Sequence, residues 1–143
     1  MKKIYTLAIF LIIIFSNINK SYSIEADVFI QSTVNRAAKT LSGNFNKEER
    51  IEMLKDIARE TVDINGIGFY SLGANRKNLS NEKLIEYKRL FSEYFLKSFS
   101  SRLAEYSNPE IEVDSKKILN EKYSIVSSTL VSTDNRPEVK IEW

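Results

Sequence analysis

Apolar residues recur at helical spacing in the first part of the chain. Between residues 27 and 41 they fall mostly on one stripe, and Gly43 follows as a natural stop. A second helix is predicted to begin near Asn46, because Asn46 and Glu49 have the spacing of a capping box. The two predicted apolar faces consist of Val28, Phe29, Val34, Ala37, Ala38 and Leu41, and of Ile51, Leu54, Ile57, Ala58 and Val62.

A longer helix, predicted over residues 81–106, carries an aromatic face. Ser80 is a suitable N-cap, and Pro109 lies just beyond the end of the pattern. The rings follow one another at a spacing of four, so they share one side of the helix: Tyr87, Phe91, Phe95 and Phe99. Such a face suits either an ordinary core or the wall of an apolar cavity, and periodicity does not separate the two.

After Pro109 the apolar residues alternate with polar ones, as in strands. We expect three antiparallel strands in a meander, at residues 111–113, 123–132 and 139–143, with turns near 120–121 and 134–137. Helices followed by a sheet make the predicted class α+β. Trp143 falls on the apolar phase of the last strand. A three-stranded sheet with nothing to close it leaves an exposed edge, so we expect the chain to be shorter than its fold requires.

The first 23 residues have the pattern of a secretory signal peptide. Lys2 and Lys3 precede an apolar run, and Ser21 and Ser23 supply small residues near a cleavage point. The run is short for a membrane span, which makes an uncleaved anchor the weaker interpretation. Residues 24–143 are then expected to form a single exported domain.

Composition removes several classes of chemistry. The chain has no Cys and no His, so it cannot form disulfides, Cys or His metal sites, or Ser–His triads. Without residues 1–23 the 21 basic residues fall by three to 18, against 19 acidic ones, a formal charge of −1. This balance does not predict nucleic-acid binding. No metal or cofactor is expected.

Three of the four glycines lie in the stretch NGIGFYSLG, residues 65–73. The stretch lacks the Lys of a phosphate-binding P-loop, and a helix rather than a strand precedes it. We therefore predict a short helix over residues 65–72, with Asp63 near its start and Gly73 at its end. We predict that Asp63 is a capping residue and not a catalytic acid or base. Gly66 and Gly68 have no explanation at this level, because glycine weakens a helix.

From Asp63 onward the chain resembles the MlaC, or toluene-tolerance, family of periplasmic phospholipid-binding proteins. The resemblance rests on Val62–Asp63, on Leu72–Gly73, on the Ser80 cap, and on Phe91, Phe95 and Tyr106 in the long helix. It covers nearly all of residues 24–143. Two departures stand out: Asn75–Arg76 replace the Trp-Arg of the family linker, and the sheet and helical segments that follow in family members have no counterpart after Trp143.

The resemblance implies a carrier that shuttles phospholipid between an outer-membrane lipoprotein complex and an inner-membrane ABC transporter complex. Such a protein needs an apolar pocket and no covalent chemistry. The expected lipid-binding residues lie on the aromatic helix face and on the sheet: Tyr87, Phe91, Phe95, Phe99, Ile125, Val139 and Ile141.

Two other functions remain open from the residues. An α+β enzyme is one, with Asp63 or Tyr87 as acid or base, and a surface position of Asp63 as a helix cap would count against it. A remnant or interaction domain that holds no lipid is the other.

Overall fold

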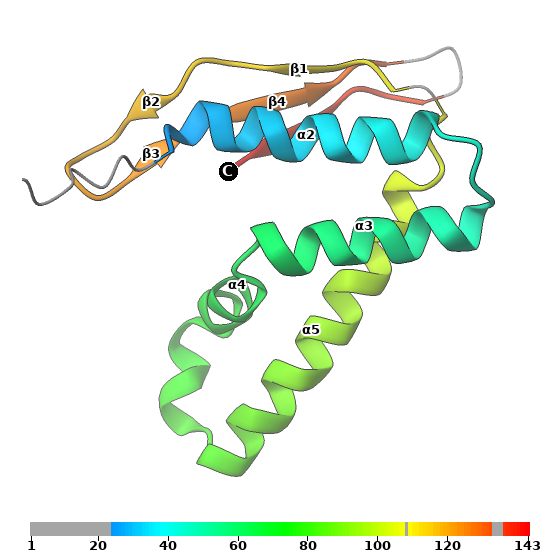
Figure 1. Cartoon of the computed structure of the whole chain (residues 1–143). Helices are drawn as coiled ribbons and strands as arrows, with labels where there is room; N and C mark the ends of the chain where they lie inside the picture. The colour runs from blue at the N-terminus through cyan, green and yellow to red at the C-terminus, as the bar shows by residue number, and fades with distance from the viewer. Residues whose placement is uncertain (1–23, 108, 133–135) are drawn as a thin grey trace, which may run out of the picture.

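The computed structural model describes residues 24–107, 109–132 and 136–143. Helices come first along the chain and strands follow (Figure 1), which confirms the α+β class. The signal peptide predicted at residues 1–23 lies outside the described residues, as does part of the turn predicted at 134–137.

The first two helices form where the apolar spacing predicts them. α2 spans Ala26–Ser42 and α3 spans Lys47–Thr61. The predicted capping box begins α3: the Asn46 side chain accepts the backbone N–H of Glu49, and the Glu49 carboxylate accepts the N–H of Asn46, both at 2.9 Å. Two backbone donors are satisfied in this way, so the start of α3 is fixed locally.

The glycine-rich stretch forms a short helix, α4, over Ile64–Ser71. Asp63 caps it, since its Oδ1 accepts the N–H of Gly66 at 2.9 Å. Gly73 then takes a φ of 53°, a left-handed conformation that suits glycine. The chain continues as a 3₁₀ helix, η1, over Gly73–Asn78. The predicted helix is therefore confirmed, and the linker that follows Gly73 forms η1.

The long helix α5 spans Asn81–Leu103 and begins at the predicted cap, where Ser80 Oγ accepts the N–H of Lys83 at 3.3 Å. It ends three residues before the predicted position. The Tyr106 N–H donates to the carbonyl of Leu103 at 3.0 Å, so a tight turn takes the place of a last helical turn. Tyr106 lies beyond α5.

The main sheet is antiparallel, in the order β1-β4-β5, as the predicted meander requires. Its strands are Ile111–Val113, Ser127–Leu130 and Val139–Glu142. The register places Ile111 opposite Leu130, and Leu130 opposite Val139.

A second, two-stranded sheet corrects the predicted strand at residues 123–132. β2 (Lys117–Ile118) pairs with β3 (Ser124–Ile125) in a hairpin that precedes β4. The predicted long strand changes partner at Val126: β3 pairs with β2, whereas β4 pairs with β1 and β5, and the Val126 backbone extends the β4–β5 ladder by pairing with Trp143. The turn predicted near residue 120 exists, but it closes this hairpin.

The helices pack on one another on one side of the sheet (Figure 1). α2 runs along the sheet and contacts β1, α3 packs on α2 and on α5, and α4 packs beside α5 (Figure 1). Three groups of buried side chains mark these contacts: Ile30, Val34 and Val126; Leu41, Leu54 and Ala104; and Ala58, Ile64 and Leu96.

Candidate functional site

A narrow apolar cavity lies where α2, α3 and α5 face the main sheet. Its volume is about 40 Å³. The helices contribute Val34, Ala37 and Leu41 from α2, Leu54, Ile57 and Ala58 from α3, and Phe99 and Leu103 from α5. The sheet side contributes Ile111, Leu130, Ile141 and Trp143.

Helical spacing brings the α2 and α3 residues to the cavity. Val34, Ala37 and Leu41 lie three and four positions apart, which places them on one face of α2. Leu54 and Ala58 are related in the same way on α3, and each is only 1% exposed. The cavity therefore lies along the seam where two amphipathic faces meet.

The polar residues of the cavity wall already have hydrogen-bond partners. Thr33 Oγ1 donates to the Phe29 carbonyl at 3.0 Å, and Thr61 Oγ1 donates to the Ile57 carbonyl at 2.7 Å. Ser128 Oγ accepts the Nε1–H of Trp143 at 3.0 Å. Because these groups are satisfied internally, the wall presents an apolar surface. No ionisable side chain lines this cavity within the described residues.

The present volume of the cavity limits what it can hold. About 40 Å³ is close to the roughly 30 Å³ that one water molecule occupies in the liquid. Pockets for drug-sized ligands measure about 300–1,000 Å³. A large ligand therefore requires the helices to move away from the sheet.

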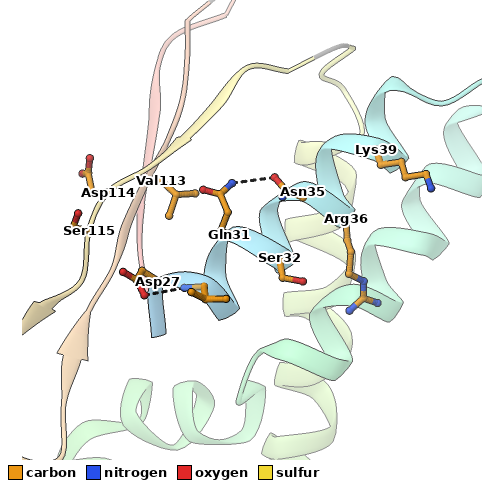
Figure 2. A pocket seen from close by; sticks show the side chains of 10 residues that line it. Asp27, Gln31, Ser32, Asn35, Arg36, Lys39, Val113, Asp114 and Ser115 are labelled. Atoms are coloured by element: carbon orange, nitrogen blue, oxygen red, sulfur yellow. Dashed lines mark hydrogen bonds between the residues drawn. The ribbon is translucent and has the colours of Figure 1, made fainter. Parts of the chain in front are cut away.

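A wider groove lies on the other side of α2 (Figure 2). It measures about 660 Å³ and is open to solvent. Figure 2 shows Gln31 on α2 pointing toward Val113, and Arg36 pointing away from the strand. Gln31 donates to Asn35 at 3.0 Å, and Arg36 pairs with Glu60 at 2.6 Å. Charged groups of both signs line this groove, so it is unsuited to an acyl chain despite its size. The apolar cavity is the better candidate for such a ligand.

The predicted lipid-binding residues divide into two sets. Phe99 and Ile141 line the cavity. The other rings of the aromatic face extend along α5 away from it: successive ring centroids from Tyr87 through Phe91 and Phe95 to Phe99 are 5.8, 6.3 and 5.5 Å apart.

Those outer rings pack against α4. Phe91 and Phe95 lie against the buried group formed by Ala58, Ile64 and Leu96, and the Tyr87 hydroxyl donates to the Gly68 carbonyl at 3.1 Å. Ile125 is half-buried in β3, and Val139 is exposed at the start of β5. Contact of all these residues with lipid remains a prediction.

Sequence reasoning assigned the α2 and α3 wall residues to core faces and did not identify them as a site. Their spacing showed that they would be buried. The structure adds the sheet residues that lie opposite them, among them Leu130, Ile141 and Trp143, and so shows that a cavity lies between the layers.

The candidate catalytic residues occupy structural positions. Asp63 is exposed and caps α4, which was the condition set against an enzyme that uses it. Among the described residues, no group of three or more Asp and Glu side chains is placed to hold a metal ion. None of the described helices has both the length and the apolarity of a membrane span.

The sequence model of the MlaC protein family matches residues 30–143. The chain belongs to the MlaC family. Among curated proteins, none matches it.

A solved structure supports the fold of this MlaC family member. It is that of a phospholipid-binding protein from Ralstonia solanacearum in complex with a phospholipid, at 1.53 Å resolution. The TM-score is 0.66 and the sequences are 13% identical, over 84% of this chain and 69% of the other. At this identity the similarity shows a shared fold.

Proposed function

We propose that this protein is a phospholipid carrier whose acyl-chain site is the apolar cavity between α2, α3, α5 and the sheet. The observation that carries the proposal is a wall without free polar groups in a chain of the MlaC family. The Ralstonia protein of similar fold, which holds a phospholipid, supports it. No covalent chemistry and no cofactor are required.

The energetics of lipid transfer demand such a wall. Each CH₂ group gains roughly 0.8 kcal/mol on leaving water, so two chains of about fifteen carbons represent about 24 kcal/mol. A carrier that exposed those chains to water would not extract a lipid from a bilayer. Leu41, Leu54 and Ala58, each at most 2% exposed, provide an environment shielded from water.

Expansion of the cavity would bring the other predicted residues into contact with lipid. Phe99 belongs both to the cavity wall and to the aromatic row, so a widened cavity would continue along Phe95 and Phe91 toward Tyr87. Ile141 would line it on the sheet side, with Ile125 and Val139 at its borders. The head group would remain in water.

The carrier would act in the periplasm, as the predicted signal peptide requires. Its partners would be an outer-membrane lipoprotein complex and an inner-membrane ABC transporter complex, and its transport would maintain outer-membrane lipid asymmetry. Family membership supports this assignment.

Native mass spectrometry of the exported protein, purified from a bacterial host, tests the cargo. We expect co-purifying phospholipid in the wild type. Ala37→Leu places a larger side chain in the cavity and should reduce bound lipid at least about tenfold, which corresponds to a loss of about 1.4 kcal/mol in binding free energy. Ala38→Leu is the matched control, because Ala38 is next in the chain and does not line the cavity.

If both variants lose lipid while their melting temperatures stay unchanged, the cavity is not the acyl-chain site. A folded wild type with no phospholipid at all would favour an interaction domain without cargo.

A further inference from the structure

The β2–β3 hairpin exposes a cluster of apolar side chains at one end of the sheet. Ile118 is 69% exposed, Leu119 52% and Tyr123 68%. No other stretch of six described residues holds three large apolar side chains that are more than half exposed. Figure 1 shows β2 and β3 projecting beyond the helices. Because more than half of each of these side chains is exposed in the described part of the chain, the cluster points to a partner.

The backbone of the hairpin tip is held in place by its own hydrogen bonds. Asn120 Oδ1 accepts the N–H of Lys122 at 2.9 Å and that of Tyr123 at 3.0 Å. The Leu119 N–H donates to the Tyr123 carbonyl at 2.9 Å. The turn is therefore ordered before any partner binds, which lowers the entropic cost of docking.

Lysines flank the apolar tip on both strands. Residues 116–123 contain three Lys and one Glu, a net charge of +2, whereas residues 24–143 together carry −1. Lys116 pairs with Glu25. Lys117 and Lys122 form no ion pair within the described residues, so their charges are available to a partner.

We propose that this hairpin docks on the surface of an anionic phospholipid bilayer. Ile118 and Leu119 would enter the boundary between head groups and acyl chains, and Tyr123 would lie at head-group level, where its ring and hydroxyl are both accommodated. Lys117 and Lys122 would extend to lipid phosphates. Glu121 is the one tip residue that opposes this contact. The inference does not require the cavity to hold lipid.

Vesicle co-sedimentation of the exported protein tests the proposal. The vesicles contain phosphatidylglycerol with phosphatidylcholine, or phosphatidylcholine alone, at low and high salt. We expect binding to the anionic vesicles, reduced by salt. Lys117→Gln with Lys122→Gln should weaken it about 25-fold, since each Lys near an anionic surface contributes a factor of about five.

Matched variants separate local contact from general charge. Lys39→Gln with Lys97→Gln removes two exposed lysines elsewhere and should leave binding within about twofold, because exposed charges beyond about 10 Å are screened. Tyr123→Ser should weaken binding, whereas Tyr94→Ser, at a tyrosine that is 71% exposed on α5, should not. Glu121→Gln should strengthen it, and the same variant centrifuged without vesicles is the control for aggregation.

Absence of binding to the anionic vesicles, or equal effects of the hairpin and control variants, would overturn the proposal. Light scattering that shows a dimer, which Ile118→Ser converts to a monomer, would also overturn it, because the hairpin would then bind a second copy of the chain. If the wild type binds a purified acidic protein but no vesicles, and the hairpin variants lose that binding, the hairpin belongs to a protein interface. Ala37→Leu should keep vesicle binding, so the cargo and docking proposals fail separately.

Discussion

At the scale of single residues, contacts across the fold explain what local pattern left open. Gly68 faces the long helix, and a Cβ there would lie 2.7 Å from Cδ1 of Phe91. At Gly66, a Cβ would lie 2.3 Å from Oδ2 of Asp63, the carboxylate that caps α4. Each glycine therefore makes room for a neighbour, and the weakening of the helix is the cost of close packing.

Gly68→Ala is expected to destabilise the protein even though alanine favours helix. The clash with the Phe91 ring should cost about 1–3 kcal/mol, and the gain in helix propensity of about 1 kcal/mol offsets only part of it. Urea unfolding measures the change. Adding Phe91→Leu should recover part of the loss, and the double-mutant cycle isolates the contact. Additive effects of the two changes would show that the ring is not the obstacle.

At the scale of elements, the features that the sequence predicts best are those that depend only on neighbouring residues of the same segment. The capping box at Asn46, the Asp63 cap and the Ser80 cap depend on residues within one turn, and all three exist. The end of α5 was misplaced because Tyr106 continues the apolar spacing while its backbone turns back to Leu103. The hairpin was missed because the run 123–132 reads as one strand, whereas the structure pairs residues 124–125 with β2 and residues 127–130 with β1 and β5.

An ion pair joins Arg136, which precedes β5, to Glu105, just beyond α5. Arg136 donates to the Glu105 carboxylate at 2.7 Å, and this hydrogen bond, with the charge of Arg136, lowers the pKa of Glu105 from its ordinary value of 4.5. A lowered carboxyl pKa stabilises the fold above the ordinary pKa. That contribution is lost as the pH falls through the lowered value.

Glu105→Gln should therefore melt below the wild type at neutral pH, by a small margin because the pair is at the surface. The difference should close as the pH falls below 4.5. Thermal melts across this range measure it. In a background of Arg136→Gln, Glu105→Gln should no longer change the pH dependence, and a gap that persists there would assign the effect to another group.

At the scale of the whole molecule, the site arises between layers and not within any element. The sequence identified the aromatic face of α5, yet only Phe99 from that row reaches the cavity. The rest of the row packs on α4, because Gly68 allows α4 to approach closely. Periodicity showed which face is buried. It could not show whether a helix or a cavity lies opposite.

Trp143, the one tryptophan of the chain, lines the cavity and can report its occupation. Phospholipid with a spin label near the middle of one acyl chain should quench Trp143 fluorescence on loading. A head-group label should quench it less, because the head group is proposed to remain in water. The same lipid without a label is the control. Equal quenching by both labels would contradict burial of the chains beside Trp143.

The empty volume of the cavity also affects how the protein responds to pressure. Pressure destabilises folded proteins in proportion to the internal voids that unfolding removes. A cavity of about 40 Å³ per molecule corresponds to about 24 mL per mole, which is within the usual volume change of unfolding of about 20–100 mL/mol. Compression therefore acts on the same space that we assign to a lipid chain. With lipid bound, less void is eliminated on unfolding, so bound lipid should raise the pressure at which this protein unfolds.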